Sequence, residues 1–150
     1  MDVRPACLTD IPRLLTLIRR YWDFEGIPGF AALRIELVLQ RLLAGPEAPG
    51  AIWVAESQGA LVGYLIVVLL MSVEHQGLMG EIDEFFVVPE ARLRGTGAQL
   101  LAAAEAELTR RGCVRLQLQL GTGNARARAF YEGQGYAPRA GYALLDKPLG

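Results

Sequence analysis

The sequence predicts an α/β fold with a mixed, mostly antiparallel sheet of six to seven strands and helices on both faces. Three observations lead to this prediction. Two apolar runs are separated by a short turn, a helical segment lies between two strand-like segments, and other stretches repeat apolar residues at helical spacing. Strands joined by a hairpin pair antiparallel, whereas a helical crossover returns a strand parallel to its neighbour. The two kinds of connection together require a mixed sheet.

The expected elements follow from periodicity and from turn-forming residues. Clusters of glycine and proline separate the periodic segments. In chain order we expect a strand over 3–6, helices over 11–22 and 31–43, strands over 51–56, 61–71 and 80–88, a helix over 97–111, a strand over 114–120, a helix over 124–134 and a last strand over 142–147. No linker is long enough to divide these elements, so residues 1–150 are expected to form one domain.

Composition and charge exclude several classes of protein. The chain has 150 residues, of which 52% are apolar and 21% charged, and its net charge of -1 gives no sign of nucleic acid or an anionic membrane as a partner. The longest apolar run, residues 60–71, is shorter than the ~20 residues of a membrane helix. Cys7 and Cys113 match no metal-ligand spacing, so no metal is expected. These features are typical of a cytoplasmic protein.

The most specific pattern is a strand, a glycine-containing turn and a helix over residues 85–101. The turn is Arg92-Leu93-Arg94-Gly95-Thr96-Gly97. Its glycines allow backbone N–H groups to converge, and the start of a helix attracts an anion. The first acidic residue of the helix is Glu105, so no nearby carboxylate competes for that position. The turn lacks the Gly-Lys-Ser/Thr ending of a P-loop and the third glycine of a dinucleotide fingerprint.

This turn resembles the Arg/Gln-x-x-Gly-x-Gly/Ala motif of the GNAT superfamily of acetyltransferases. The preceding Phe85-Phe86-Val87-Val88-Pro89 is similar to the strand before that motif, and residues 4–10 are similar to the opening of the family's fold. A second family signature, Asn-x-x-Ala-x-x-Phe-Tyr-x-x-x-Gly-Phe, is matched by residues 124–136, where Tyr136 replaces the final Phe. Order and spacing agree over essentially the whole chain.

The resemblance implies that acetyl-CoA is the cofactor. Its pyrophosphate would bind the backbone amides of the turn, and the strand at 85–87 would pair with the pantetheine arm as an added strand does. Arg126 and Arg128 could reach the adenosine phosphates or simply face solvent. The implied cofactor-binding residues are Phe85, Phe86, Val87, Arg92, Leu93, Arg94, Gly95, Thr96, Gly97, Ala98, Asn124 and Ala127.

Tyr131 is the expected general acid. Acetyl transfer to an amine needs a base for the ammonium proton, stabilisation of the developing oxyanion, and an acid for the leaving thiolate. A phenol with a pKa near ~10 is close to matched with an alkyl thiolate. Tyr131 also lies two helical turns after Asn124, on the same side of that helix. In the alternative interpretation, Phe130 and Tyr131 are an aromatic pair that closes the core.

The base is expected among the carboxylates of the strand over 80–88. In a regular strand Glu81, Asp83 and Phe85 share one face. The resemblance places the base, or a carboxylate that binds the amine, at Glu81 or Asp83. A β-bulge in this strand would swap the faces and favour Glu84. The structural alternative is that these charges protect a strand edge from aggregation.

We therefore predict an acetyl-CoA-dependent N-acetyltransferase that acts on a primary amine of a small molecule or a protein by direct attack on the thioester. Acidic and aromatic residues near 22–25 and 74–84 suit a cationic acceptor. A non-catalytic acetyl-CoA-binding sensor would keep the turn but would need neither the phenol nor the carboxylates. A dinucleotide-binding oxidoreductase would need the missing third glycine. The resemblance also implies a homodimer, because members of the family commonly form one.

Overall fold

The computed structural model describes residues 1–150, which divide into two compact units, Met1–Leu118 and Gln119–Gly150. Each unit is described by itself. The first contains, in chain order, β1 (Asp2–Pro5), the 3₁₀ helix η1 (Leu8–Asp10), α1 (Ile11–Glu25), α2 (Ala32–Leu42), β2 (Gly50–Ser57), β3 (Ala60–Ser72), β4 (Gly77–Val87), the 3₁₀ helix η2 (Pro89–Ala91), α3 (Thr96–Arg110) and β5 (Arg115–Leu118). The second contains one helix, α4 (Ala125–Gly133).

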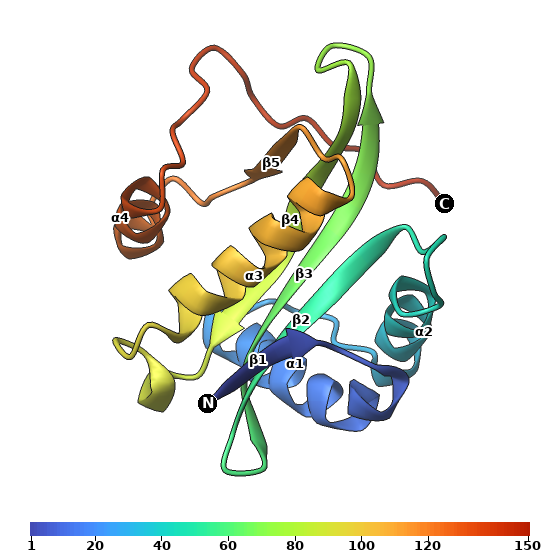
Figure 1. The fold of residues 1–150 in the computed structure, drawn as a ribbon, viewed down its shortest axis with the longest axis vertical. Coiled ribbons are helices and arrows are strands. Elements are labelled where there is room, and N and C mark those ends of the chain that lie inside the picture. The colour runs from blue at the N-terminus through green and yellow to red at the C-terminus, as the bar shows by residue number, and fades with distance from the viewer. The chain divides into compact units, whose positions relative to one another are not determined.

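The first unit is built on one sheet with the strand order β1-β2-β3-β4-β5 (Figure 1). The first four strands pair antiparallel, and β5 pairs parallel with β4. The turn between β2 and β3 consists of Gln58 and Gly59, both with positive φ, as in a tight two-residue hairpin. The helix α3 is the crossover between the two parallel strands. The predicted mixed, mostly antiparallel sheet is therefore confirmed.

The sheet has five strands, fewer than the six to seven that were predicted. The strand predicted over 142–147 does not form. These residues have no regular secondary structure, and the side chains of Tyr142, Leu144 and Leu145 are exposed. A strand is stable only when its backbone pairs with a neighbour. The unit Gln119–Gly150 contains no other strand, so it offers no neighbour of its own.

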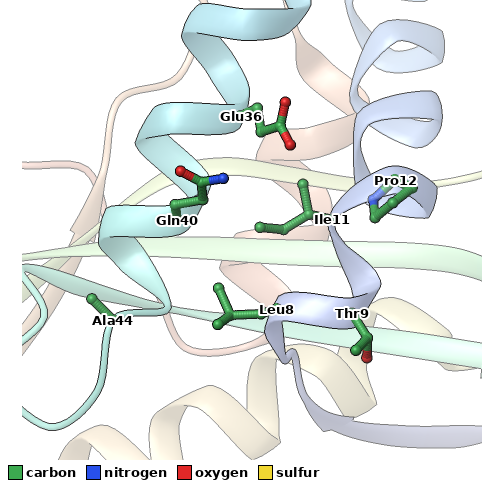
Figure 2. Close-up of a pocket in the computed structure, with 7 residues that line it drawn as sticks. All are labelled: Leu8, Thr9, Ile11, Pro12, Glu36, Gln40 and Ala44. Atoms are coloured by element: carbon green, nitrogen blue, oxygen red, sulfur yellow. The ribbon is translucent and has the colours of Figure 1, made fainter.

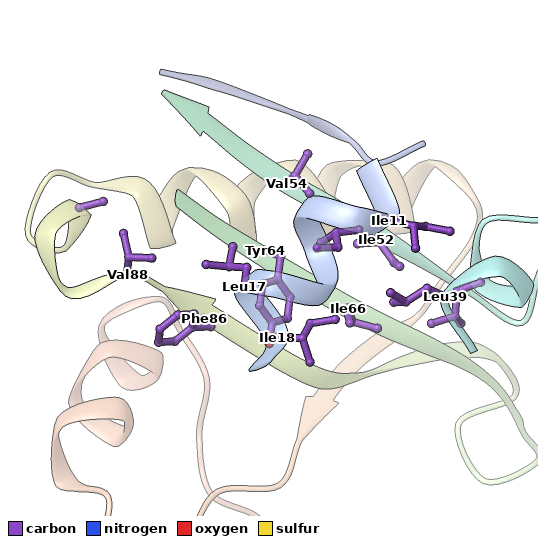
Figure 3. Packing of buried hydrophobic residues seen from close by; sticks show 13 residues of the cluster. Ile11, Leu17, Ile18, Leu39, Ile52, Val54, Tyr64, Ile66, Phe86 and Val88 are labelled. Atoms are coloured by element: carbon purple, nitrogen blue, oxygen red, sulfur yellow. The ribbon is translucent and has the colours of Figure 1, made fainter. Parts of the chain in front are cut away.

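Helices cover both faces of the sheet, as predicted. α1 and α2 pack on one face, where side chains of α1 meet those of β2, β3 and β4 (Figure 3). The buried residues of this layer are Ile11, Leu14, Leu17, Ile18, Leu39, Leu42, Ile52, Val54, Tyr64, Ile66, Phe86, Val88 and Ala91. α3 lies on the other face, where a side chain at Gly63 would come within 3.1 Å of Leu100. No helix combines the length and apolar character needed to span a membrane.

A network of charges around the buried Asp10 joins β1, β2 and α1. Asp10, which is 1% exposed, accepts hydrogen bonds from both terminal nitrogens of Arg4 at 2.8 and 2.9 Å and from Arg13 at 2.8 Å. Glu56 accepts from the same two arginines at 2.8 and 3.1 Å. The backbone N–H of Cys7 donates to Asp10 at 2.9 Å. The Arg4 hydrogen bonds are the largest of the effects that hold the pKa of Asp10 well below its usual range.

The second unit is organised around one capped helix and a group of aromatic rings. Asn124 precedes α4, and its side-chain oxygen accepts the backbone N–H of Ala127 at 3.1 Å, which is a typical helix cap. The ring centroid of Tyr131 lies 5.4 Å from that of Phe130 and 5.7 Å from that of Tyr136, in edge-to-face geometry. These contacts fix the Tyr131 ring within its own unit.

Candidate active site

β4 contains a β-bulge among the carboxylates that were expected to supply the base. The pairing with β3 shifts between Ile66 and Val67: Val67 lies opposite Ile82, and Ile66 lies opposite Glu84. Asp83 is therefore the extra residue on the bulged strand. Such an insertion reverses the faces of all the residues that follow it.

The bulge changes which residues of β4 share a face. A side chain at Gly80 would point into the layer of α3, whereas Phe86 packs against α1. In a regular strand these two residues, an even number of positions apart, would share a face. The prediction that Glu81, Asp83 and Phe85 share one face is therefore wrong, and the alternative in which a bulge swaps the faces is confirmed.

Glu84 is held between α1 and β3. One carboxylate oxygen accepts the indole N–H of Trp22 at 2.8 Å, and the other accepts the hydroxyl of Tyr64 at 2.8 Å. Burial raises the pKa of Glu84, and the two hydrogen bonds act against this rise. The pKa of Tyr64 is also raised, by burial first and by the Glu84 charge second, so this phenol stays protonated and continues to donate.

The other two carboxylates of β4 have different surroundings. The side chain of Asp83 is exposed, but its pKa is raised. The main cause is partial desolvation by the surrounding protein, and the second is the charge of Glu81. Glu81 accepts a hydrogen bond from the amide nitrogen of Gln117 on β5 at 3.1 Å. The three carboxylates lie within one short stretch of β4, but Glu84 is the one that is bonded through both oxygens.

The ladder between β4 and β5 ends beside the bulge. Its pairs run from Met79 with Arg115 to Ile82 with Leu118. Beyond Ile82, β4 continues to Val87 paired with β3 but not with β5. An extended ligand can add to such a strand edge through backbone hydrogen bonds.

The turn over residues 92–97, which was predicted to bind phosphate and is called the phosphate turn below, leads into α3. Gly95 is the N-cap, with a φ of 79° that suits glycine and strains other residues. The hydroxyl of Thr96 donates to the carbonyl of Ala91 at 3.2 Å and so ties the turn to η2. The first turn of α3 has no acidic residue, and the N–H groups of residues 93–98 donate to no backbone carbonyl. This arrangement fits an anion such as a pyrophosphate.

Arg92, the first residue of the motif, turns toward the protein. Its Nε donates to the carbonyl of Val87 at 2.9 Å. Its guanidinium lies over two aromatic rings, 5.0 Å from the centroid of Phe24 and 5.7 Å from that of Phe86. Arg94, in contrast, is exposed at the turn. The two arginines of the motif therefore have different environments.

The remaining expected site residues, Asn124, Ala127 and Tyr131, belong to the unit Gln119–Gly150. The first two bond to each other through the helix cap. On the same helix Arg128 donates to Glu132 at 2.8 Å, and both side chains are exposed. That contact favours the interpretation of Arg128 as part of a solvated helix face.

A hollow of about 680 Å³ lies elsewhere, between η1, α1 and α2 (Figure 2). Its lining residues are Leu8, Thr9, Ile11, Pro12, Glu36, Gln40 and Ala44. None of them belongs to β4 or to the phosphate turn, so this hollow is separate from the candidate active site.

Several contacts in the site were missed by reasoning from sequence. Trp22 and Tyr64 bind Glu84, and Phe24 stacks on Arg92. Tyr64 carried a usable signal, because a hydroxyl within an apolar strand requires a hydrogen-bond partner once it is buried. Its partner was not readable, because the bulge decides which carboxylate of β4 reaches it.

Comparison with known proteins identifies the family of this chain. The sequence model of the Acetyltransferase (GNAT) family matches residues 12–136. The uncharacterized N-acetyltransferase YhfO of Bacillus subtilis is 28% identical over 149 residues, covering 95% of this chain and 93% of the relative. An uncharacterized N-acetyltransferase of Archaeoglobus fulgidus is 37% identical over 138 residues, covering 89% of this chain and 91% of the relative.

Solved structures share the same fold. The integron cassette protein HFX_CASS3, from the mobile metagenome of Cole Harbour Salt Marsh, superposes with a TM-score of 0.86 and 28% identity, over 99% of this chain and 90% of that chain. A predicted acetyltransferase from Clostridium acetobutylicum, solved with acetyl-CoA, has a TM-score of 0.81 at 18% identity, over 97% of this chain and 95% of that chain. The family match and these relatives together show that this chain belongs to the GNAT family and is an acetyltransferase.

Proposed function

We propose that this protein transfers the acetyl group of acetyl-CoA to a primary amine of a small molecule or a protein. The observation that carries the proposal is the turn at the start of α3, where N–H groups without backbone acceptors meet a helix end free of acidic residues. A non-catalytic acetyl-CoA sensor would need this turn alone. The carboxylates at the bulge of β4 favour an enzyme, because removal of the amine's proton requires a base.

Acetyl-CoA suits the residues of the first unit. The amides of residues 93–98 would hold its pyrophosphate, and the end of β4 beyond Ile82 would hold its pantetheine arm. The Clostridium acetobutylicum protein, which has the same fold, was solved with acetyl-CoA and so supports this assignment. When bound, the cofactor supplies a thioester: the amine nitrogen forms a C–N bond with the acetyl carbon, and the C–S bond breaks.

Glu84 is the base that the bulge favours, and Tyr131 is the acid. Glu84 is held by two hydrogen bonds, and its raised pKa makes it a better proton acceptor than an ordinary carboxylate. Each oxygen accepts one hydrogen bond and keeps a second lone pair, so Glu84 could take the amine's proton directly or through a water. The exposed Asp83 would anchor the cationic amine. Tyr131, assigned from the family signature, would give its proton to the leaving thiolate.

The cofactor assignment can be tested with Gly97→Asp. An acidic residue in the first turn suits the helix dipole, so the fold should persist, but its charge would repel the pyrophosphate. A penalty of about 2 kcal/mol would weaken coenzyme A binding about thirtyfold. Calorimetric titration of coenzyme A into the wild type, Gly97→Asp and the uncharged control Gly97→Asn measures this effect.

Gly97→Asn should lose far less affinity than Gly97→Asp. Equal affinity of Gly97→Asp and the wild type would place the pyrophosphate elsewhere.

The activity itself is tested by adding a panel of primary amines to the wild type with acetyl-CoA and measuring free thiol. If coenzyme A binds and no amine accelerates thiol release, the sensor function is correct.

The base assignment predicts a specific pH dependence. A base works only when deprotonated, so kcat/KM should rise with pH through the pKa of Glu84, which lies above the ordinary ~4.3. In Glu84→Gln that limb should disappear, and kcat/KM at neutral pH should fall about tenfold or more, recovering at alkaline pH as the amine deprotonates by itself.

Asp83→Asn is the matched comparison for Glu84→Gln. Its expected effect is a higher KM for the amine with little change in kcat, because an anchoring charge acts on binding. If Asp83→Asn removes the acid limb and Glu84→Gln keeps it, Asp83 is the base and the assignment must be reversed.

A further inference from the structure

The family resemblance places Arg92 among the cofactor-binding residues, but its side chain makes contacts within the protein. Its Nε binds the carbonyl of Val87, the last residue of β4. Its planar group covers the ring of Phe24, near the end of α1. One side chain thus connects the end of β4, the end of α1 and the turn that starts α3.

The backbone of the turn after Arg92 adopts an unfavourable conformation that contacts from neighbouring residues must stabilise. Leu93 has a φ of 64°, in the left-handed region that costs a residue with a side chain of order 1 kcal/mol, and its side chain is 99% exposed. No packing of Leu93 itself can hold that conformation. The contacts that do flank it are those of Arg92 on one side and the Thr96 to Ala91 hydrogen bond on the other.

The same end of α1 also reaches the proposed base. Trp22 donates to Glu84, and Phe24, two residues further along α1, lies under Arg92. The ring of Phe24 also lies 6.2 Å from that of Phe86, so it is part of a continuous aromatic contact with β4. The last turn of α1 therefore touches both the carboxylate at the bulge and the arginine at the turn.

We infer that Arg92 is a positioning residue that couples the end of α1 to the acetyl-CoA turn, and that it does not act as a phosphate ligand. This inference rests on the proposed function, since it assigns acetyl-CoA to the turn. Its consequence is that a change at Phe24, which belongs to α1 and not to the turn, alters the affinity for coenzyme A.

Charge-conserving and charge-removing variants distinguish positioning from phosphate binding. Arg92→Lys keeps the positive charge but loses the Nε–H bond and the planar group that stacks on the rings. Positioning predicts that Arg92→Lys and Arg92→Met weaken coenzyme A binding similarly, with the same salt dependence as the wild type. If Arg92→Lys retains wild-type affinity while Arg92→Met loses it, Arg92 is a phosphate ligand and the inference is overturned.

A double-mutant cycle tests the coupling to α1. Phe24→Leu should raise the Kd for coenzyme A about two- to fivefold, the range expected for loss of a partly exposed cation–π contact. In an Arg92→Met background the same change should have no effect. Phe30→Leu is the comparison, since Phe30 also packs against the end of α1, beside Trp22, but lies under Arg19 and not under Arg92. An unchanged Kd in Phe24→Leu, or fully additive effects, would overturn the coupling.

Hydrogen exchange without any ligand separates this inference from the proposed function. Arg92→Met and Phe24→Leu should both speed exchange of the two hydrogen-bonded amides that flank the turn, Arg92 (to Pro89) and Gln99 (to Gly95), relative to the wild type, and Phe30→Leu should not. Faster exchange in a protein that binds no coenzyme A would refute the cofactor assignment and leave the mechanical link intact. Unchanged exchange in both variants would refute the link, whatever the protein binds.

Discussion

Replacing Tyr131 by phenylalanine is expected to lower kcat about a hundredfold or more, with little change in the affinity for acetyl-CoA. The substitution removes one hydroxyl and keeps the ring, so the edge-to-face contacts with Phe130 and Tyr136 persist. The leaving thiolate would then depart without a proton from the protein. Pre-steady-state measurement of acetyl transfer isolates this step from product release.

Tyr136→Phe is the matched control for the acid. It removes a hydroxyl from the ring that packs against Tyr131 in the same unit, and we expect kcat to stay within about twofold of the wild type, since this hydroxyl has no proposed role in proton transfer. If Tyr131→Phe changes kcat no more than Tyr136→Phe does, the aromatic pair is structural and the acid is another group.

The second large effect is expected on stability. Asp10→Ala should lower the free energy of unfolding by about 3 kcal/mol at neutral pH. It would remove a buried carboxylate that accepts five hydrogen bonds, three from Arg4 and Arg13 and two from the backbone and the thiol of Cys7, and leave the arginines without that charge. We place the loss at the lower end of the range for broken buried pairs, because Arg4 is 29% exposed and can turn to water. Urea unfolding at pH 7 measures it.

The pH dependence of this effect has a definite sign. The native pKa of Asp10 lies below its unfolded value, so the unfolded state binds more protons between the two values and stability rises with pH there. The contribution is complete above the unfolded pKa of ~3.9 and is lost as the pH falls through the native pKa. The difference in stability between the wild type and Asp10→Ala should therefore be constant from about pH 5 to 8 and shrink below about pH 4.

Glu90→Gln serves as the control for burial. Glu90 accepts a bidentate pair of hydrogen bonds from Arg20 at 2.8 and 2.9 Å, but both side chains are largely exposed. Exposed ion pairs contribute little, so this variant should be much less destabilised than Asp10→Ala. Equal losses in the two variants would show that burial does not determine the strength of the Asp10 network.

Most of the fold was predictable because its signals are local. The hairpin between β2 and β3 was readable from two apolar runs and a short turn, and α3 from its apolar face and its glycine-containing start. The strand over 142–147 had a similar apolar pattern but does not form. Its formation depends on a pairing partner elsewhere in the chain, and an apolar pattern does not specify one.

The candidate site was predictable in its residue types but not in its geometry. The turn and the helix start follow from glycines that are adjacent in the chain, and they form where they were predicted. The orientation of the β4 carboxylates depends on one extra residue at Asp83, and this cannot be read from an alternating pattern. A shift of one residue exchanges the faces and brings Glu84, not Glu81 or Asp83, to Trp22 and Tyr64.

The order of the elements, the mixed sheet and the glycine-containing turn before α3 follow from residues that are close in the chain. Backbone conformation and helix-end chemistry depend mainly on near neighbours, so these features were visible without a structure. The bulge, the partners of Glu84 and the stacking of Arg92 on Phe24 depend on contacts between segments that are far apart in sequence. Strand register and side-chain pairing are set by which segments pack together, so these features required the folded chain.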